Sequence, residues 1–422
     1  MLKLIRMSLF VFLANSSLAQ WQWTELSNMP FESANNALCE AIVGGQEFVY
    51  SFGGIDPTKL YSGIHQRAAK YTVSSDTWVE IDSLPDTIGK IAAGASFVKD
   101  KIYIMGGYHV FSNNTEISSD KVHVYNPTTD TYEADGASIP LAIDDHVQCV
   151  YKDSLIYVIT GWSNTGNVPN VQIYDPSFDS WQVGTSTPST FRFETFGASG
   201  YILGDTIYYY GGAAGSNFSA RRFMRRGYIN PLNPTDIVWT EIDSSPGNAG
   251  YRSACSGDGN VVFWVGGSPT SYNFNGIAYD GSGGVNPSLR ILEFNNTAYE
   301  YNDDIPQTNS LMDLRGIAKL AERRWIIAGG MDVNQIVSKR TFLLENPSLN
   351  LFENDPKVFL VKYQDGQVVI ESAYKSTAKL TDVAGTMVAE YKENEIFYIS
   401  KNVHSTGVYL FVQGANSIRI QL

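Results

Sequence analysis

The chain has 422 residues, of which 43% are hydrophobic and 13% aromatic, so it can bury a large core and does not have a disordered composition. The 30 Lys and Arg residues against 43 Asp and Glu residues give a net charge of −13. This negative balance repels phosphate and anionic lipid, which disfavours nucleic acid and membrane surfaces as partners. The 25 tyrosines and 37 glycines, spread over short alternating runs, favour an all-β fold.

Residues 1–19 have the pattern of a secretory signal peptide. Lys3 and Arg6 precede a short apolar run, and Ser17 and Ala19 are small residues at the positions usual before a cleavage site. The apolar run is too short to span a membrane, and no later run reaches the ~18 apolar residues of a span. We therefore expect export and no transmembrane segment.

A short aromatic strand that ends in a glycine pair recurs along the chain. We call it the marker strand, and its best copy runs from Tyr103 to Gly107. The six copies are marked by the aromatic residues Tyr50, Tyr103, Tyr157, Tyr208, Phe263 and Trp325. The steps between these positions are 53, 54, 51, 55 and 62 residues. Self-similarity at about fifty residues is typical of a propeller array of the kelch type.

Two more strands follow most marker strands. Aromatic residues stand seven residues apart in the pairs Tyr71 and Trp78, Tyr125 and Tyr132, and Tyr174 and Trp181. The residues between them favour hairpin turns. With the apolar strand before the marker, one repeat is a four-stranded sheet, and such sheets bury their faces by packing radially about an axis. These features resemble the kelch family over about residues 20–345, a resemblance that identifies a scaffold and hardly a function.

The number of blades follows from the two ends of this region. The sixth repeat has a first strand, a marker strand and a third strand, but no tryptophan strand follows it. Residues 23–26 supply the missing outer strand from the other end and remove the free edges. The sequence therefore predicts a six-bladed propeller over residues 20–345, closed by its N-terminal strand.

The three cysteines occupy similar places in alternate blades. Cys39, Cys149 and Cys255 lie 8 to 11 residues before the marker aromatic of blades one, three and five. We expect buried free thiols at equivalent core positions, because no spacing pattern indicates a disulfide or a metal site.

The C-terminal part has a different period. Residues 346–355 have the composition of a linker, and residues 356–422 alternate as short strands without glycine pairs, which predicts a small β-sandwich. Residues 380–388 and 407–412 resemble the C-terminal sorting domain of the type IX secretion system. The resemblance implies delivery through the periplasm to the outer surface of a Gram-negative bacterium, with that secretion machinery as a partner. The Pro-Asn-Pro opening of the family is missing, and an ordinary accessory sandwich is the alternative.

One face of the predicted propeller collects the candidate binding residues. The loops after the marker strands and the segments that lead into each blade share this face, which we call the loop face. The predicted ligand-binding residues on the lead-in segments are Asn36, Lys90, Asp145, His146, Arg192, Tyr251, Arg252 and Arg315. Arginine forks beside carboxylates suit an anionic or hydroxyl-rich ligand, such as an acidic sugar. The alternative is that these residues pair with their neighbours and seal the central channel.

The longest loops of the loop face offer a second place for recognition. They follow the marker strands of blade two, at 108–120, and of blade five, at 268–288. Long loops on a rigid scaffold often carry binding sites. They are equally compatible with tolerated surface insertions.

The sequence supports two hypotheses for function. No phosphate-binding loop, Gly-x-Ser-x-Gly or catalytic Cys-His motif is present, and the five histidines lack ligand spacing, so no cofactor or metal is predicted. The first hypothesis is a secreted or cell-surface module that binds a glycan or a protein. The alternative is a sugar-active enzyme, since kelch propellers of similar size include bacterial sialic-acid (N-acetylneuraminate) mutarotases. The catalytic candidates are Arg192, Glu194, Arg252 and Arg315. That resemblance implies that the three arginines, beside Glu194, hold a sugar carboxylate while an acid or base acts at the anomeric centre.

Overall fold

The computed structural model describes residues 21–242, 249–295, 299–302, 305, 307–309, 311–321 and 323–346, followed by 359–364, 367–382, 387–400, 408–413 and 416–421. The expected signal peptide, residues 1–19, lies outside the described residues, as does the expected linker apart from Asn346. The chain divides into two compact units, Met1–Leu349 and Asn350–Leu422.

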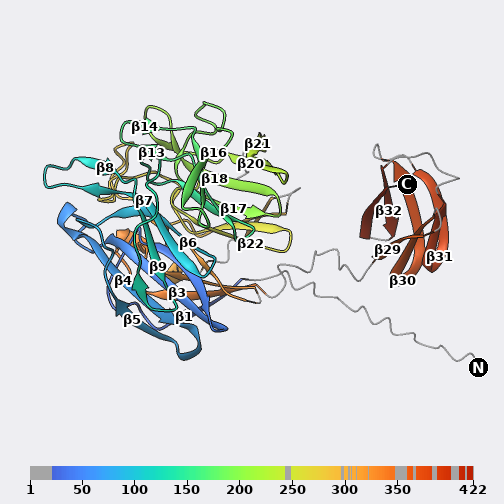
Figure 1. Cartoon of the computed structure of the whole chain (residues 1–422), viewed down its shortest axis with the longest axis horizontal. Helices are drawn as coiled ribbons and strands as arrows, with labels where there is room; N and C mark the ends of the chain where they lie inside the picture. Colours follow the sequence, from blue (N-terminus) through green and yellow to red (C-terminus); the bar gives the residue numbers. More distant parts are fainter. Residues whose placement is uncertain are drawn as a thin grey trace, which may run out of the picture. The chain divides into compact units, whose positions relative to one another are not determined.

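The first unit contains six antiparallel sheets of four main strands each, which follow one another along the chain (Figure 1). Two of these sheets also contain a short fifth strand. Blade one comprises β2 (Ala37–Val43), β3 (Gln46–Ile55), β4 (Ile64–Thr72) and β5 (Thr77–Ile81). Blade two comprises β6 (Ile91–Val98), β7 (Lys101–Val110), β9 (Val122–Asn126) and β10 (Thr131–Tyr132). Blade three comprises β11 (Val147–Tyr151), β12 (Leu155–Ile159), β15 (Val171–Asp175) and β16 (Ser180–Val183). Blade four comprises β17 (Phe196–Leu203), β18 (Thr206–Ala214), β20 (Met224–Asn230) and β21 (Asn233–Ile242). Blade five comprises β22 (Ala254–Asp258), β23 (Val261–Val265), β24 (Ile291–Phe294) and β25 (Tyr299–Asn302). Blade six comprises β26 (Ala318–Lys319), β27 (Arg324–Ala328), β28 (Thr341–Glu345) and β1 (Gln22–Leu26).

Short elements extend the loops between these strands. They are the strands β8 (Glu116–Ser118), β13 (Trp162–Ser163), β14 (Gly166–Asn167) and β19 (Ser219–Ala220), and the 3₁₀ turns Tyr61–Gly63, Val73–Ser75, Gln307–Asn309 and Val333–Gln335. β8 and β19 pair with the marker strands β7 and β18, so they lengthen the loops that rise on the loop face.

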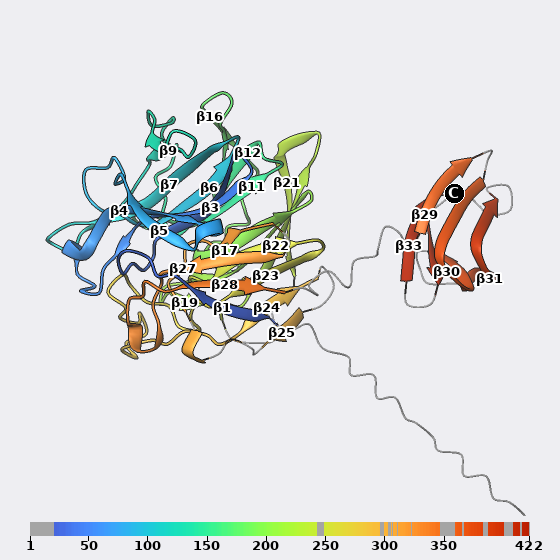
Figure 2. The same cartoon turned by 90° about the horizontal axis from the view of Figure 1, so that it is seen from below.

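The ring closes as the sequence predicts. β1 pairs antiparallel with β28, with Trp23 opposite Leu344, and so becomes the outer strand of blade six (Figure 2). Trp21 packs against Phe263 of blade five and Trp325 of blade six, with ring centroids 4.7 and 5.5 Å away. The first and last strands of the propeller therefore share one sheet, and the neighbouring blades are joined by a buried aromatic contact.

The aromatic pairs that mark the outer strands face each other across their hairpins. Tyr71 is the register partner of Trp78, and Tyr174 that of Trp181. Blade five departs from this spacing, yet Phe294 still pairs with Tyr299 across β24 and β25. The shorter spacing changes the turn and leaves the four-stranded sheet intact.

The glycine pairs allow a close backbone approach. Gly106 and Gly107 have φ of 63° and 84°, a region that favours glycine. A Cβ on Gly106 would lie 2.4 Å from the carbonyl oxygen of Ile143, in the segment that leads into the next blade. The closest neighbour of this glycine is therefore main chain. Glycine is required because the next blade begins against this strand end.

The cysteines lie near the axis of the ring. Cys39 and Cys149 are buried, Cys255 is partly buried, and all three are free thiols. Burial raises their pKa values, so the thiols stay protonated at neutral pH. They fill small spaces between blades, as expected.

The second unit is an antiparallel sheet around one long strand. The strand order is β29 (Phe359–Gln364), β30 (Gln367–Asp382), β32 (Val408–Gln413) and β33 (Asn416–Gln421), and β31 (Met387–Ser400) also pairs with β30. The two ends of β30 pair with different partners, β29 with its first residues and β32 with its last. A buried apolar cluster consists of Val368, Ile370, Ala378, Leu380, Phe397 and Ile399. Alternating strands agree with the sequence pattern, and the closed sandwich stays a prediction.

Among the described residues of both units, no helix is long and apolar enough to cross a membrane.

Candidate functional site

A cavity of about 330 Å³ lies among the first strands of the six blades, all of which contribute lining residues. Small residues form much of its wall, including Gly94, Ala95, Ser199 and Ser256, while His146 and Arg315 also line it. We call it the axial cavity.

A ring of hydrogen bonds encircles the axis at the loop face. One residue at the lead-in to each blade has a positive φ between 47° and 68°. These six residues are Asn35, Ala92, Asp145, Gly197, Arg252 and Asp313. Each main-chain link around the ring is 2.8 to 3.1 Å long, for example from the Gly197 N–H to the Asp145 oxygen and from the Arg252 N–H to the Gly197 oxygen. One link uses a side chain, since the Ala92 N–H donates to Asn35 Oδ1 at 3.0 Å.

An ion-pair layer fills the centre of this ring. Arg252 Nε and Nη2 donate to the two carboxylate oxygens of Asp145 at 3.1 and 2.6 Å, and Arg252 Nη1 donates to Asp313 Oδ1 at 2.9 Å. All three side chains are at most 2% exposed. Asn35 Nδ2 and the Tyr272 hydroxyl also donate to Asp313 Oδ1, both at 3.2 Å. The layer separates the axial cavity from the loop face, which favours the sealing role for these charges.

Arg315 and His146 lie on the cavity side of this layer. Arg315 Nη2 donates to the His146 carbonyl at 2.7 Å, and Arg315 Nη1 lies 3.6 Å from Asp145 Oδ1. Burial, together with the nearby Arg315 charge, lowers the pKa of His146 to about 4, so this imidazole is neutral at neutral pH. Both residues were predicted to bind a ligand at the loop face, and the structure places them below the seal instead.

Two other predicted binding residues support the ring. Asn36 is buried and its Nδ2 donates to Ser51 Oγ at 2.8 Å. Tyr251 is fully buried, and its hydroxyl donates to the Tyr272 carbonyl at 3.1 Å. Neither residue lines the pocket described below.

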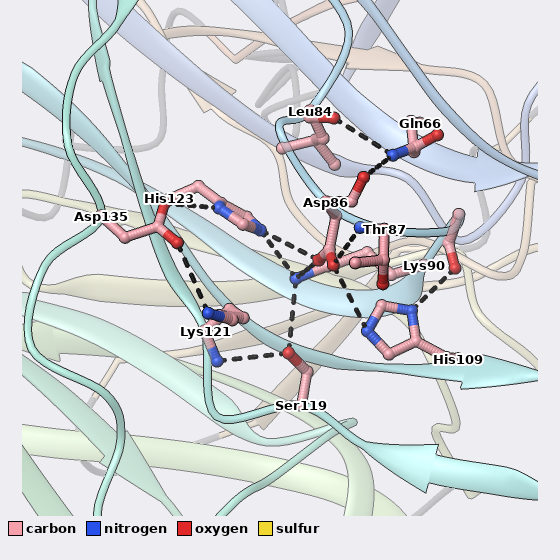
Figure 3. Close-up of polar contacts among 11 residues, drawn as sticks. Gln66, Leu84, Asp86, Thr87, Lys90, His109, Ser119, Lys121, His123 and Asp135 are labelled. Carbon is pink, nitrogen blue, oxygen red and sulfur yellow. Dashed lines mark hydrogen bonds and ion pairs between the residues drawn. The ribbon is translucent and has the colours of Figure 1, made fainter.

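Lys90 lies in a buried charge network between blades one and two (Figure 3). Its Nζ is 2.6 Å from Asp86 Oδ2 and 3.1 Å from His123 Nε2. His123 also contacts Asp86 at 3.0 Å and Asp135 at 2.8 Å. Burial lowers the pKa of Lys90. Burial alone would raise the pKa of Asp86, but the hydrogen bond with His123 and the charge of Lys90 outweigh this effect and hold its pKa well below its usual range. The ammonium of Lys90 is thus committed to Asp86 rather than presented to a ligand.

Arg192 and Glu194 lie at the periphery of blade four. Arg192 Nε and Nη2 donate to the carboxylate of Glu241, on the outer strand β21. Glu194 Oε1 accepts from the Ser189 hydroxyl at 2.6 Å. The sequence comparison of lead-in segments places Arg192 near the axis, but Gly197 occupies the ring position of this blade. The catalytic candidates of blade four therefore line neither cavity described here.

A second, smaller cavity of about 130 Å³ opens on the other side of the ion-pair layer. We call it the loop-face pocket. Its lining residues come from blades two to five and are Tyr108, Glu116, Asp144, Asp145, Trp162, Phe196, Phe218, Arg252, Asn273 and Tyr279. The volume is below the roughly 300 Å³ that a drug-sized ligand needs, so the pocket suits one small ring or the end of a longer molecule.

Aromatic side chains form one wall of this pocket. Trp162, Phe196 and Phe218 contact one another edge to face with centroids 5.4 to 5.8 Å apart, and Tyr279 lies 5.0 Å from Phe218. Such a cluster is apolar and fixed by mutual packing. It offers ring faces and edges to the apolar side of a bound molecule.

The carboxyl groups of Asp144 and Glu116 also line the pocket. Asp144 accepts from the Ser118 hydroxyl at 2.6 Å, and burial together with the adjacent Asp145 charge raises its pKa well above its usual range. Its environment therefore favours the protonated form of the Asp144 carboxyl. Glu116 is an exposed residue that accepts from Asn273 Nδ2 at 3.0 Å. Partial desolvation of its carboxyl raises its pKa.

The sequence pointed to part of this pocket. Asp145 and Arg252 are predicted binding residues that line it, and the loops 108–120 and 268–288 contribute Tyr108, Glu116, Asn273 and Tyr279. Trp162, Phe196 and Phe218 were not identified. Trp162 directly follows the marker strand of blade three, so a comparison of the residues just after each marker strand would have found it.

The comparisons agree with this architecture. A family model described as the kelch motif matches residues 92–134, which span the four main strands of blade two. The chain is a six-bladed kelch-repeat propeller. It is 28% identical over 160 residues to the kelch-like protein terF of Aspergillus terreus, covering 36% of this chain and 33% of that protein. It is 24% identical over 243 residues to kelch-like protein 25 of Xenopus tropicalis, covering 50% of this chain and 38% of that protein.

A solved structure extends the likeness to the whole ring. The structure of YjhT superposes with a TM-score of 0.58 at 15% identity, covering 76% of this chain and 97% of YjhT. The chain spans about a third of the length of the curated kelch-like relatives that it matches. These comparisons therefore establish a shared fold and leave the activity to the chemistry of the site.

Proposed function

We propose that this kelch propeller is a sugar-active protein of the mutarotase type, which binds a small sugar in the loop-face pocket and interconverts its anomers. The observation that carries the proposal is the buried carboxyl of Asp144 in a small pocket with an aromatic wall, where its environment favours the protonated form. Aromatic walls suit the apolar face of a sugar ring, and a pocket of about 130 Å³ suits a single ring.

The reaction needs one group that gives a proton and another that takes one. Ring opening breaks the bond between the anomeric carbon and the ring oxygen, protonates that oxygen and removes the proton of the anomeric hydroxyl. A neutral carboxyl can do both, because one oxygen donates its proton while the other accepts. The Asp144 acid is then regenerated, and closure on the other face of the carbonyl gives the second anomer.

Substitution of Asp144 tests this role directly. We expect purified wild type to accelerate mutarotation of at least one sugar among glucose, glucosamine, N-acetylglucosamine and N-acetylneuraminate, followed by NMR from a pure anomer. Asp144→Asn keeps the size of the side chain and removes the acid, so the rate above buffer should fall by about a hundredfold. Asp236→Asn, on the outer hairpin of blade four, is the matched control. A wild-type rate equal to buffer for all four sugars would overturn the catalytic proposal.

Binding without turnover is the second candidate function. The aromatic wall of Trp162, Phe218 and Tyr279 supports it independently of the acid. In that case sugars would give saturation-transfer NMR signals with the protein, while mutarotation would proceed at the buffer rate. Loss of these signals in a Trp162→Ala variant would tie binding to the pocket, and unchanged signals would rule the pocket out.

We also propose that the protein is exported and delivered to the cell surface through its C-terminal unit. The signal-peptide pattern of residues 1–19 and the resemblance of residues 356–422 to a sorting domain support this proposal. In a bacterium that carries type IX secretion, removal of residues 356–422 should leave the propeller in the periplasm. Normal surface delivery of the shortened chain would refute the sorting role.

A further inference from the structure

The loop-face pocket has a charge preference of its own. We infer that it takes a sugar carrying an ammonium group, an amino sugar, in preference to an acidic or a neutral one. The inference rests on the proposed function for the sugar ring and adds the charge of the ligand. It departs from the sequence expectation of an acidic sugar held by arginines.

The first argument is that the arginine of the pocket is already committed. Arg252 lines the pocket, but Nε and Nη2 bind Asp145 and Nη1 binds Asp313. A sugar carboxylate that took over this guanidinium would deprive the two buried carboxylates of Asp145 and Asp313 of their closest cationic partner, which is strongly unfavourable. Arg192 and Arg315, the other expected partners of a carboxylate, line the pocket at no point.

The second argument is that the remaining ionisable groups near the ligand are acids. Among the residues that line the pocket, Asp144 and Glu116 are carboxyls without a cationic partner in the described contacts. Their hydrogen-bond donors are the neutral groups of Ser118 and Asn273. An ammonium ion would stabilise the ionised form of either carboxyl, whereas a ligand carboxylate would stabilise only the neutral form.

The third argument is that the aromatic wall of the pocket also favours a cation. Aromatic faces attract ammonium groups through their quadrupoles, and this attraction is strongest where water is excluded. Trp162, Phe218 and Tyr279 are only partly buried, so they keep surface available to a ligand. Carboxyls and aromatic rings that line one small cavity together favour an amine over an amide or an acid of the same shape.

Three sugars test the inference without changing the protein. Glucosamine, N-acetylglucosamine and N-acetylneuraminate present an ammonium, a neutral amide and a carboxylate, and their affinities can be measured by calorimetry on the full chain at a pH where the amine is protonated. We expect glucosamine to bind about five- to tenfold more tightly than N-acetylglucosamine, and N-acetylneuraminate to bind most weakly. Equal affinities, or tightest binding of N-acetylneuraminate, would overturn the inference.

A charge variant locates the preference. Glu116→Gln removes one carboxyl and keeps an oxygen that can accept from Asn273, so the advantage of glucosamine over N-acetylglucosamine should shrink to about twofold. Asp280→Asn removes a carboxyl from the blade-five loop that carries Asn273 but lies outside the pocket lining, and it should keep the wild-type ratio. An unchanged ratio in Glu116→Gln would refute the role of this carboxyl.

The same sugars separate this inference from the proposed function. Acceleration of mutarotation with no preference among the three sugars supports the function and overturns the inference. Preferential binding of glucosamine without acceleration supports the inference and overturns the catalytic role. Absence of binding by all three sugars and by glucose overturns both.

Discussion

At the scale of single residues, neighbours in the sequence face different cavities. Asp145 and Arg252 line the loop-face pocket, while the next residues, His146 and Ser253, line the axial cavity. Alternation of side chains along an extended segment produces this division. One row of ion-paired side chains therefore separates a site with candidate chemistry from a cavity with small walls.

Asp86 is the residue for which pH should matter most to stability. Its side chain is 5% exposed and its folded pKa lies below the unfolded value of about 3.9. The folded state is therefore favoured above that value, and this advantage is lost as the pH falls toward the folded pKa. The lowered pKa of His109 acts in the same direction, because burial disfavours the imidazolium of the folded state as the pH falls below about 6.5.

We predict that Asp86→Asn lowers the free energy of unfolding by about 3 kcal/mol at pH 7, because Lys90 is left buried without its counter-ion. The difference from wild type should narrow as the pH falls from 4 to about 2, where the carboxylate of the unfolded wild type is protonated. Urea unfolding across this range measures both quantities. Adding Lys90→Met to Asp86→Asn should restore most of the loss at pH 7, and no restoration would contradict the ion-pair account.

At the scale of elements, the strand ends specify how blades meet. The glycine pair ends each marker strand against the lead-in segment of the next blade, as Gly106 does against Ile143. In blade three a threonine replaces the first glycine of the pair. Thr160 takes the first glycine position with φ of 47°, and its hydroxyl donates to the Val168 carbonyl at 2.9 Å. A side chain is tolerated there because it finds its own hydrogen bond.

A comparison of two glycines distinguishes the destabilisation caused by steric contact of an added Cβ from that caused by a positive φ. Gly106 and Gly44 both have positive φ, of 63° and 58°, but nothing lies within 4 Å of a Cβ on Gly44. We predict that Gly44→Ala lowers the free energy of unfolding by about 1 kcal/mol and Gly106→Ala by about 3 kcal/mol or more. Chemical denaturation of the two variants gives the comparison, and equal losses would show that the carbonyl contact is unimportant.

At the scale of the whole molecule, the fold could be predicted further than the site. Six marker strands and an unpaired strand at the beginning predicted the number of blades and residues 23–26 as the outer strand of blade six. In the structure this strand pairs residues 22–26 with 341–345. These patterns are periodic, and each copy supports the others. The long loops of blades two and five were also recognisable by length.

The pocket could be predicted only in part, because it depends on main-chain geometry that no repeat encodes. The ring residue of each blade is defined by its positive φ, and six different lead-in sequences adopt it. In blade four the ring residue is Gly197, five positions beyond Arg192, so comparison of charged residues alone places that arginine wrongly in space. The commitment of Arg252 to two aspartates likewise appears only when blades three, five and six meet.

The pairing of β1 with β28 has a consequence for the order of folding. The two strands are more than 300 residues apart, and blade six has no outer strand until they meet. Such a distant contact closes slowly, and it cannot form before residue 345 has left the ribosome. The other blades can pair their strands earlier, but the hydrogen-bonded ring at the loop face needs all six. The binding pocket, which lies against that ring, is therefore completed at the last step of folding.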